Sequence, residues 1–295
     1  MSETVGIVGV GLVGTALAQN LLKAGFDVVG YDIDKSRCDR LRSMGGRPAG
    51  SPADVGAAAP RVMLSLLTSD VVRDVVEGPD GLLAADTPPR TIVDTTTGDP
   101  DETAALAARL AGRGVAYLDA TVAGSSRQVA DRTGVFMVGG DADAFAACDD
   151  LFAALGGNAR HLGGAGSGAR AKLACNLVLG LNRLALAEGL VLAERLGLEP
   201  RGFLDLLRRT PAYSAAMDVK GEKMLRGDFA PAARLAQHRK DVALILDCAE
   251  RVGQDLPLSA AHLAVLDAAI AAGDGDLDNA AVIRELRRRG RGPRA

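Results

Sequence analysis

The stretch that decides the fold is "IVGVGLVGTALAQNLLKAG", Ile7 to Gly25. A short β-branched run leads into a glycine-rich turn, and the turn opens directly into a helical segment. Gly9, Gly11 and Gly14 give the turn the pattern G-x-G-x-x-G. At these positions glycine permits a tight turn, leaves room beside the backbone, and lets helix and strand approach closely. The stretch therefore predicts the first strand–turn–helix unit of an α/β sheet.

The same alternation continues through the first half of the chain. Strand-like runs occupy residues 4–9, 27–32, 61–67, 91–97, 115–122 and 134–140, and helix-like segments occupy 14–25, 99–114 and 141–156. Strands that alternate with helices are typical of a mostly parallel sheet covered by helices on both faces. The pattern predicts an N-terminal doubly wound, Rossmann-type domain.

The second half of the chain shows no such alternation. After Gly166 the strand signal ends, and residues 169–198 form one long helical pattern followed by shorter helical segments. Glycines in "HLGGAGSG", residues 161–168, let the chain turn into a second domain. We expect a Rossmann-type domain over 1–164 and an all-α domain over 165–295, joined through the long helix.

Composition narrows the class of protein. The chain has 295 residues, 48% of them hydrophobic and 24% charged, with a formal net charge of -3. Mild acidity gives no reason to expect nucleic acid or an anionic membrane as a partner. The start lacks the basic region of a signal peptide, and the apolar stretch 173–198 contains Arg183, Glu188 and Glu194. We expect a cytoplasmic protein in which this stretch is a buried helix, not a membrane span.

Cysteines and histidines give no metal signature. The histidines form no local cluster in the sequence, and no CxxC pair occurs among the cysteines, which are Cys38, Cys148, Cys175 and Cys248. We expect reduced, mostly buried thiols and no metal. The basic stretch 284–295 is interpreted as a frayed, solvated tail in preference to an anion site.

The glycine turn also indicates a ligand. The N-terminus of a helix after such a turn favours an anion, so the backbone from Gly9 to Gly14, including Val10, Leu12 and Val13, suits a dinucleotide pyrophosphate. Asp32 ends the second strand, where a carboxylate hydrogen-bonds ribose hydroxyls and repels a 2′-phosphate. The pattern favours NAD. Because Lys35 and Arg37 follow closely, NADP stays possible.

A second stretch, "GAGSGARAKLACN" at 164–176, places a lysine and an amide on one helical face, as Lys172 and Asn176. A dinucleotide site implies hydride transfer, and hydride transfer at an alcohol carbon needs a group that takes the hydroxyl proton. Burial and the positive end of the helix would lower the pKa of Lys172 toward that task. The alternative is a lysine whose head group reaches water or pairs with a glutamate.

Several segments, in order, resemble the β-hydroxyacid dehydrogenase family, and the match covers essentially the whole chain. They are the opening glycine motif, "DTTT" (94–97), "DATVAGS" (119–125), "FMVGGD" (136–141), "GSGARAKLACN" (166–176), "RKDVALILDCAERVG" (239–253) and "GDGDLDNAAVI" (273–283). The resemblance implies an NAD(P)-dependent oxidoreductase acting on a small anionic 3-hydroxy acid. Imine reductases share the architecture but generally carry another residue at the lysine position.

The resemblance also implies roles for individual residues. Lys172 is then the general acid/base, Asn176 a substrate-side amide, and Lys240 a second-domain lysine that reaches the cofactor, with Asp241 beside it. The remaining implied positions are the substrate loop residues Ala123, Gly124 and Ser125, and the nicotinamide-side residues Leu67, Thr68 and Thr97.

The chain departs from the family pattern mainly in the substrate loop. Thr121 stands where the family has proline, and Ala123 where it has a serine that holds the substrate carboxylate. A lost hydrogen bond to a charged group is worth about 1.5–3 kcal/mol. The N–H groups of Gly124 and Ser125 and nearby serine hydroxyls offer replacements, and Arg127 is either a contact for a second anion or an exposed charge. Three other family positions also differ, at Leu67, Cys175 and Ala233.

Two further questions stay open at the level of sequence. The same site would serve a hydroxyacid dehydrogenase or a semialdehyde reductase running in the opposite direction, and a non-catalytic NAD-binding metabolite sensor is a third reading. The long helix is rich in leucine and alanine on more than one face, which predicts a homodimer or homotetramer.

Overall fold

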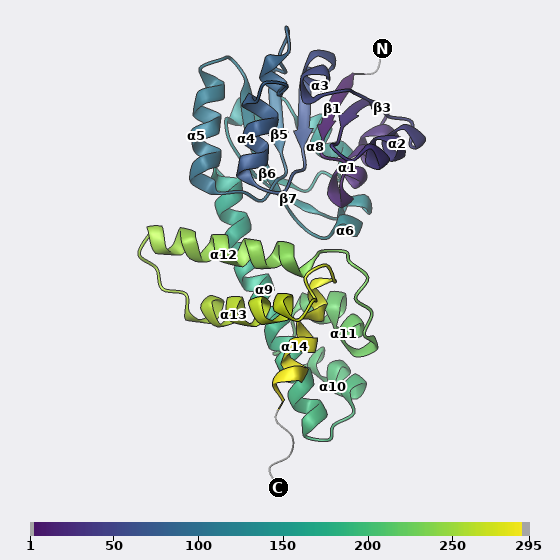
Figure 1. The fold of residues 1–295 in the computed structure, drawn as a ribbon, viewed down its shortest axis with the longest axis vertical. Coiled ribbons are helices and arrows are strands. Elements are labelled where there is room, and N and C mark those ends of the chain that lie inside the picture. The colour runs from purple at the N-terminus through teal and green to yellow at the C-terminus, as the bar shows by residue number, and fades with distance from the viewer. Residues whose placement is uncertain (1–2, 291–295) are drawn as a thin grey trace. The chain divides into compact units, whose positions relative to one another are not determined.

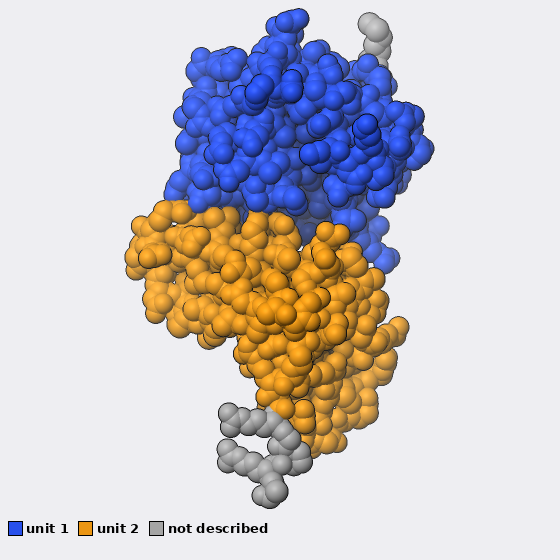
Figure 2. Space-filling model, viewed as in Figure 1, with its two compact units in different colours: residues 1–172 blue, residues 173–295 orange. Residues whose placement is uncertain are grey.

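The computed structural model describes residues 3–290. These residues form two compact units, one that ends at Lys172 and one that begins at Leu173, which Figure 2 shows in separate colours. The units divide inside the long helix α9 (Ser167–Arg195), whereas the boundary expected at 164/165 lies in the turn before it.

In the described part of the chain, unit 1 contains an eight-stranded sheet with the order β3-β2-β1-β4-β5-β6-β7-β8. Neighbouring strands pair in parallel except β6 and β7, which pair antiparallel. The expected doubly wound, Rossmann-type sheet is confirmed. Its strands are β1 (Thr4–Val8), β2 (Asp27–Tyr31), β3 (Arg47–Pro48), β4 (Arg61–Leu64), β5 (Thr91–Asp94), β6 (Ala116–Ala123), β7 (Val135–Gly139) and β8 (Ala159–His161).

Helices cover both faces of this sheet (Figure 1). One face packs against α1, α6 and α8, and the other against α3, α4, η1 and α5. The helices of unit 1 before α9 are α1 (Leu12–Lys23), α2 (Lys35–Ser43), α3 (Pro52–Ala58), α4 (Ser69–Glu77), η1 (Leu82–Ala84), α5 (Pro100–Ala111), α6 (Ser126–Ala130), α7 (Ala142–Ala146) and α8 (Asp149–Ala154).

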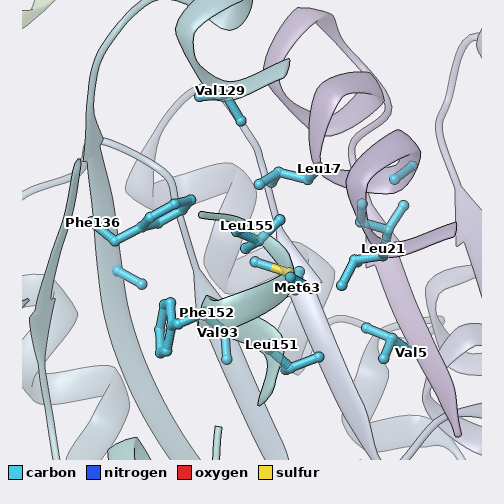
Figure 3. Packing of buried hydrophobic residues seen from close by; sticks show 14 of the residues in the cluster. Val5, Leu17, Leu21, Met63, Val93, Val129, Phe136, Leu151, Phe152 and Leu155 are labelled. Atoms are coloured by element: carbon cyan, nitrogen blue, oxygen red, sulfur yellow. The ribbon is translucent and has the colours of Figure 1, made fainter. Parts of the chain in front are cut away.

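Figure 3 shows how α1 is fixed on its face of the sheet. Leu17 and Leu21 of α1 are completely buried in one cluster with Phe136 of β7 and Phe152 of α8. The two phenylalanine rings meet edge to face with their centroids 5.7 Å apart. Each such side chain contributes about 1.5–3 kcal/mol by leaving water. This burial holds the N-terminus of α1 against the glycine turn.

Unit 2 is helical and has its own core of buried leucines, methionines and alanines. Its elements after α9 are α10 (Pro200–Leu207), the π-helical turn η2 (Met217–Gly221), α11 (Glu222–Arg226), α12 (Leu235–Arg251), α13 (Pro257–Ala271), η3 (Asn279–Ala281) and α14 (Val282–Arg289). By length and composition α9 would suffice to cross a membrane, with a mean hydropathy of 1.4 over its most apolar window, 33% of which is buried. A long core helix of a folded domain meets the same two criteria.

Some expectations fail. The helix expected over 141–156 is two helices, because the chain breaks at Ala147 and Cys148 between α7 and α8. Most thiols are not buried: only Cys148 is, whereas Cys175 is exposed. The frayed tail expected over 284–295 is wrong for its first part, because α14 extends to Arg289 and its arginines pair with carboxylates; residues 291–295 lie outside the described residues.

Candidate active site

The glycine turn between β1 and α1 has the shape that a dinucleotide pyrophosphate needs. Gly9 has a φ of +90°. A Cβ on Gly14 would lie 1.9 Å from the carbonyl oxygen of Gly9, whereas a Cβ on Gly11 would meet only Arg37 Nη1, at 3.8 Å. Gly11 caps α1 without any side-chain hydrogen bond. The turn therefore leaves backbone N–H groups and open space together at the helix N-terminus, which fits a bound diphosphate.

Asp32, at the end of β2, is joined to this turn. Its Oδ2 accepts from the N–H of Val10 at 2.7 Å, and its Oδ1 accepts from the N–H of Asp34 at 2.9 Å. The guanidinium of Arg37 lies 3.3 Å from the same carboxylate. A buried acid and a half-exposed cation thus stand side by side where an adenine ribose would bind. Leu12 of α1 and Ile33, directly after Asp32, are both exposed apolar side chains.

The loops after β4 and β5 are tied to each other by threonines. Thr95 Oγ1 donates to the carbonyl of Leu64 at 2.7 Å, and Thr96 Oγ1 accepts from the N–H of Leu66 at 3.0 Å. Of the predicted residues here, Leu67 is exposed and Thr68 caps α4 through its side chain. The structure thus gives Thr68 a capping role and assigns the cross-links to two threonines that the sequence interpretation left unassigned.

Behind these loops lies a carboxylate that the sequence interpretation also left without a role. Asp94 is buried at the end of β5, and Tyr117 Oη donates to its Oδ2 at 2.5 Å. Burial raises the pKa of Asp94 to about 6. The pair borders a pocket of about 150 Å³ that also contacts Ser69, Thr96 and Arg109. Asp94 Oδ1 accepts from the N–H of Thr96, so this carboxylate fixes the threonine loop.

The first turn of α9 is fastened to β6. Asp119 accepts from the N–H of Gly166 at 2.9 Å and from that of Ala169 at 2.8 Å. Thr121 Oγ1 donates to the carbonyl of Gly168 at 2.9 Å. A Cβ on Gly168 would lie 2.3 Å from the carbonyl oxygen of Met137, so only glycine fits there. Thr121, which replaces the family's proline, therefore has a definite structural role.

This fastening places Lys172 next to the predicted substrate loop. Its Nζ donates to the carbonyl oxygen of Val122 at 2.6 Å, and Val122 directly precedes Ala123. The side chain of Lys172 is half-buried. The contact shows that the ammonium does not extend away from the sheet but sits where β6 ends and the loop from Ala123 to Ser125 begins.

Ser125 has less to offer a ligand than the sequence suggests. It forms a capping box with Gln128 at the start of α6: its N–H donates to Gln128 Oε1 at 2.9 Å, and its Oγ accepts from the Gln128 N–H. Gly124 has a φ of +150°, which turns the backbone out of β6. Arg127 is exposed and lies 3.6 Å from Asp131, which agrees with the reading of a surface charge.

In unit 2, Asn176 of α9 and Lys240 of α12 meet through one carboxylate. Asn176 Nδ2 donates to Asp241 Oδ2 at 3.0 Å, and Lys240 Nζ lies 3.2 Å from Asp241 Oδ1. Asp241 is therefore the residue that holds the two predicted side chains together, and it is mostly buried. Among the described residues, no group of histidine, cysteine, aspartate and glutamate has the arrangement of a metal site.

Comparisons with known proteins agree with this geometry. The family model for the NAD-binding domain of 6-phosphogluconate dehydrogenase matches residues 4–163, and that for the NAD-binding of NADP-dependent 3-hydroxyisobutyrate dehydrogenase matches residues 166–286. L-threonate dehydrogenase of Cupriavidus necator is 32% identical, over 96% of both chains. 2-(Hydroxymethyl)glutarate dehydrogenase of Eubacterium barkeri is 31% identical, over 95% of this chain and 93% of its own.

The chain belongs to the β-hydroxyacid dehydrogenase family. A solved 3-hydroxyisobutyrate dehydrogenase from Salmonella typhimurium has a TM-score of 0.88 and 26% identity, covering 96% of this chain and 99% of that one. The Mycobacterium tuberculosis 3-hydroxyisobutyrate dehydrogenase with L-serine has a TM-score of 0.86 and 30% identity, covering 97% and 100%.

Family membership sets the general activity. This β-hydroxyacid dehydrogenase is an NAD(P)-dependent hydroxyacid dehydrogenase, as predicted, and its glycine turn is shaped for that cofactor. A solved imine reductase from a Pseudomonas species, at 23% identity and a TM-score of 0.64, shares the fold alone.

Proposed function

We propose that this enzyme oxidises small 3-hydroxy acids to a semialdehyde or 3-oxo acid, with NAD preferred over NADP and with Lys172 as the general acid/base. One observation carries the proposal. The Lys172 amino group is anchored 2.6 Å from the Val122 carbonyl, at the start of the loop that would hold the substrate carboxylate.

The anchor suits proton transfer. The bound dinucleotide supplies the hydride acceptor, which leaves the hydroxyl proton to the protein. A neutral lysine has two N–H groups and one lone pair, so donating one N–H to Val122 fixes the nitrogen without occupying the lone pair. Lys172 then takes the hydroxyl proton in oxidation and returns it in reduction. The fastening of α9 to Asp119 and Thr121 keeps this nitrogen in place.

The substrate carboxylate would bind the backbone turn at Gly124, next to Ala123 and Ser125. Because the Ser125 N–H and hydroxyl serve the capping box, the Gly124 turn is left to carry more of this contact. Asn176, held by Asp241, would orient the substrate hydroxyl. Lys240 would contact the cofactor. The names of the relatives support this class of substrate, since L-threonate and 2-(hydroxymethyl)glutarate are both hydroxy acids.

The reverse reaction is the second candidate. Glyoxylate/succinic semialdehyde reductase 2 of Arabidopsis thaliana is 29% identical, over 96% of this chain and 79% of its own. One acid/base serves both directions, so rates measured with NAD plus hydroxy acid and with NADH plus semialdehyde would rank the two.

The test of the proposal is Lys172→Met. We expect turnover to fall by about 10²–10⁴-fold, the usual cost of removing a general acid/base. Affinity for NAD should stay within a few-fold, since the glycine turn is unchanged. Lys172→Arg should not restore turnover, because a guanidinium stays protonated at working pH.

Lys223→Met is the matched control. Lys223 Nζ also donates to a backbone carbonyl, that of Ala230, and the residue is half-buried like Lys172, but it lies on α11 of unit 2. This variant should keep its activity. Near-normal turnover in Lys172→Met would remove Lys172 from catalysis, and an inactive wild-type enzyme across hydroxy acids and semialdehydes would favour the metabolite sensor.

A further inference from the structure

The pocket of about 150 Å³ in unit 1 lies between α4 and α5, which run side by side on one face of the sheet (Figure 1). Its wall consists of side chains from these two helices, the end of β5 with the loop after it, and Tyr117 of β6. Every residue of the wall belongs to unit 1. A cavity of this volume holds a molecule of about six heavy atoms.

Asp94 brings to this wall a buried carboxylate that lacks a counter-ion. The residue is 4% exposed, and its hydrogen bonds come from the Tyr117 hydroxyl at 2.5 Å and the Thr96 N–H at 2.8 Å. Both donors are neutral, and no cation among the described residues forms an ion pair with Asp94. Burial raises the pKa of Asp94 to about 6, so the carboxylate is ionised at pH 8. A buried charge is costly unless an opposite charge accompanies it.

The two arginines of the wall do not supply the opposite charge. Arg109 of α5 donates to both carboxylate oxygens of Glu77, each at 2.8 Å. Arg73 Nη2 lies 2.7 Å from Asp70 Oδ1. Neither of these partner acids lines the pocket. Both guanidinium groups are therefore neutralised from outside the wall, and the charge of Asp94 is left without compensation.

A second acid adds to the excess of negative charge. Glu102 lies in the first turn of α5, it is exposed, and it lines the pocket. Within the part of the chain that the structure describes, its side chain forms no ion pair. Asp94 and Glu102 thus face the same pocket without a cation of their own. A ligand with a positive charge is the one that this pocket attracts.

The rest of the wall favours an organic cation. Val72 and Leu106 are buried apolar residues that line the pocket beside Asp94. The oxygen atoms of the wall accept hydrogen bonds: Tyr117 Oη points its hydrogen at Asp94 and keeps its lone pairs, and Thr103 also carries a hydroxyl. An ammonium group has three N–H donors for such acceptors. A short carbon chain attached to it would contact the apolar residues.

We propose that this pocket binds a small primary alkylammonium ion, with the ammonium group at Asp94 and the carbon chain along Val72 and Leu106. The ligand would compensate a charge that the free protein already keeps buried, so the cost of desolvating Asp94 does not fall on binding. The wall contains neither the glycine turn nor Lys172, and the inference therefore does not depend on the proposed function. Because Asp94 also holds the N–H of Thr96, the ligand would contact the carboxylate that fixes the threonine loop.

The experiment measures the Tm of the full chain at pH 8 with about 30 mM propylammonium chloride. Sodium propionate, propan-1-ol and sodium chloride at the same concentration are the comparison solutes. A ligand of this size binds with a Kd on the order of 1 mM, so propylammonium should raise the Tm by about 3 °C or more. Propionate and propanol should raise it no more than sodium chloride does, since the first has the wrong charge and the second has none.

Variants locate the binding. Asp94→Asn keeps an oxygen for the Thr96 N–H and removes the charge, so it should abolish the rise in Tm. Glu102→Gln changes an exposed side chain and should raise the Kd for propylammonium about threefold. Asp86→Asn is the matched control, because Asp86 is an exposed acid of unit 1 outside the wall, and this variant should show the full rise.

Three results would overturn the inference. They are a wild type whose Tm propylammonium does not raise, an equal rise with propanol, and a rise that persists in Asp94→Asn.

Discussion

At the scale of single residues, Asp32 and Arg37 have opposite effects on the preference for NAD or NADP. The carboxylate is buried and bonded to the glycine turn, whereas Arg37 lies 3.3 Å away with 43% of its side chain exposed. A 2′-phosphate would be repelled by the first and attracted by the second. We expect kcat/KM to favour NAD over NADP. Asp32 is held in place by the Val10 N–H, so its repulsion of a 2′-phosphate should outweigh the attraction from the partly exposed Arg37.

The measurement is the ratio of kcat/KM for the two cofactors. Asp32→Asn keeps an oxygen for the Val10 N–H and removes the charge, so the ratio should fall about tenfold or more. Arg37→Ala should raise it. Equal efficiency with both cofactors in the wild type would contradict the assignment of Asp32.

The raised pKa of Asp94 predicts how the stability of the protein depends on pH. Burial raises its pKa from 3.8 to about 6, so the folded protein holds this proton more tightly than the unfolded chain. The stabilisation is full below pH 3.8 and lost as the pH rises through 6. Asp94→Asn does not titrate and so has no such loss. Above pH 6 its free energy of unfolding should exceed that of the wild type by up to roughly 3 kcal/mol.

Thermal unfolding of the two proteins between pH 4 and pH 8 tests this. The difference in Tm between the two proteins should become smaller toward pH 4. His262, with its pKa lowered to about 4, destabilises the fold as the pH falls through the same range, but it contributes equally to both proteins. A gap that does not change with pH would show that Asp94 does not titrate in this range.

The sequence can single out a residue where the motif that contains it is short and local. Gly9, Gly14 and Lys172 belong to short motifs whose spacing is legible in the chain. Asp119 and Thr121 are different: their partners in the first turn of α9 are 47 to 50 residues away. Only the fold brings these atoms together. The sequence likewise gives no sign that Arg183, one of several charged residues in α9, is buried.

At the scale of elements, the turn between β1 and α1 depends on glycine in a way that can be measured. In Gly14→Ala the new Cβ would meet the Gly9 carbonyl oxygen at 1.9 Å, so the strand and helix must separate. We expect at least a tenfold loss of NAD affinity and a lower Tm. Gly112→Ala is the control, since that residue is in the αR region at the end of α5 and its Cβ would make only ordinary contacts.

The elements that the sequence missed were short or held by distant partners. β3 and β8 have two and three residues, too few to show any periodicity. The sequence does not predict α14 because its run of arginines is typical of a solvated tail. In the structure Arg287 pairs with Glu194 of α9, and Arg288 pairs with Asp274. These carboxylates turn a basic run into an anchored helix.

At the scale of the whole molecule, α9 presents an exposed stripe that nothing in unit 2 covers. The side chains of Val178, Leu192 and Leu196 are 56%, 60% and 69% exposed. Asn182 and Ala185 are exposed between them and Gly189 is half-buried, so that the six positions follow one another at alternating steps of four and three residues. This is the spacing of a helix seam. The stripe contains few charges, as expected for a surface that packs against another helix.

We propose that the stripe pairs with the same stripe of a second copy, as the prediction of a homodimer or homotetramer requires. A two-fold axis would bring α9 of one copy against α9 of the other. Apolar surfaces of this kind are typical of obligate interfaces. Light scattering at micromolar concentration should give at least a dimer. The double variant Leu192→Glu/Leu196→Glu should be monomeric, because it places four carboxylates on one seam. Leu258→Glu, at a leucine 67% exposed on α13, should leave the assembly unchanged. A monomeric wild type would refute the seam.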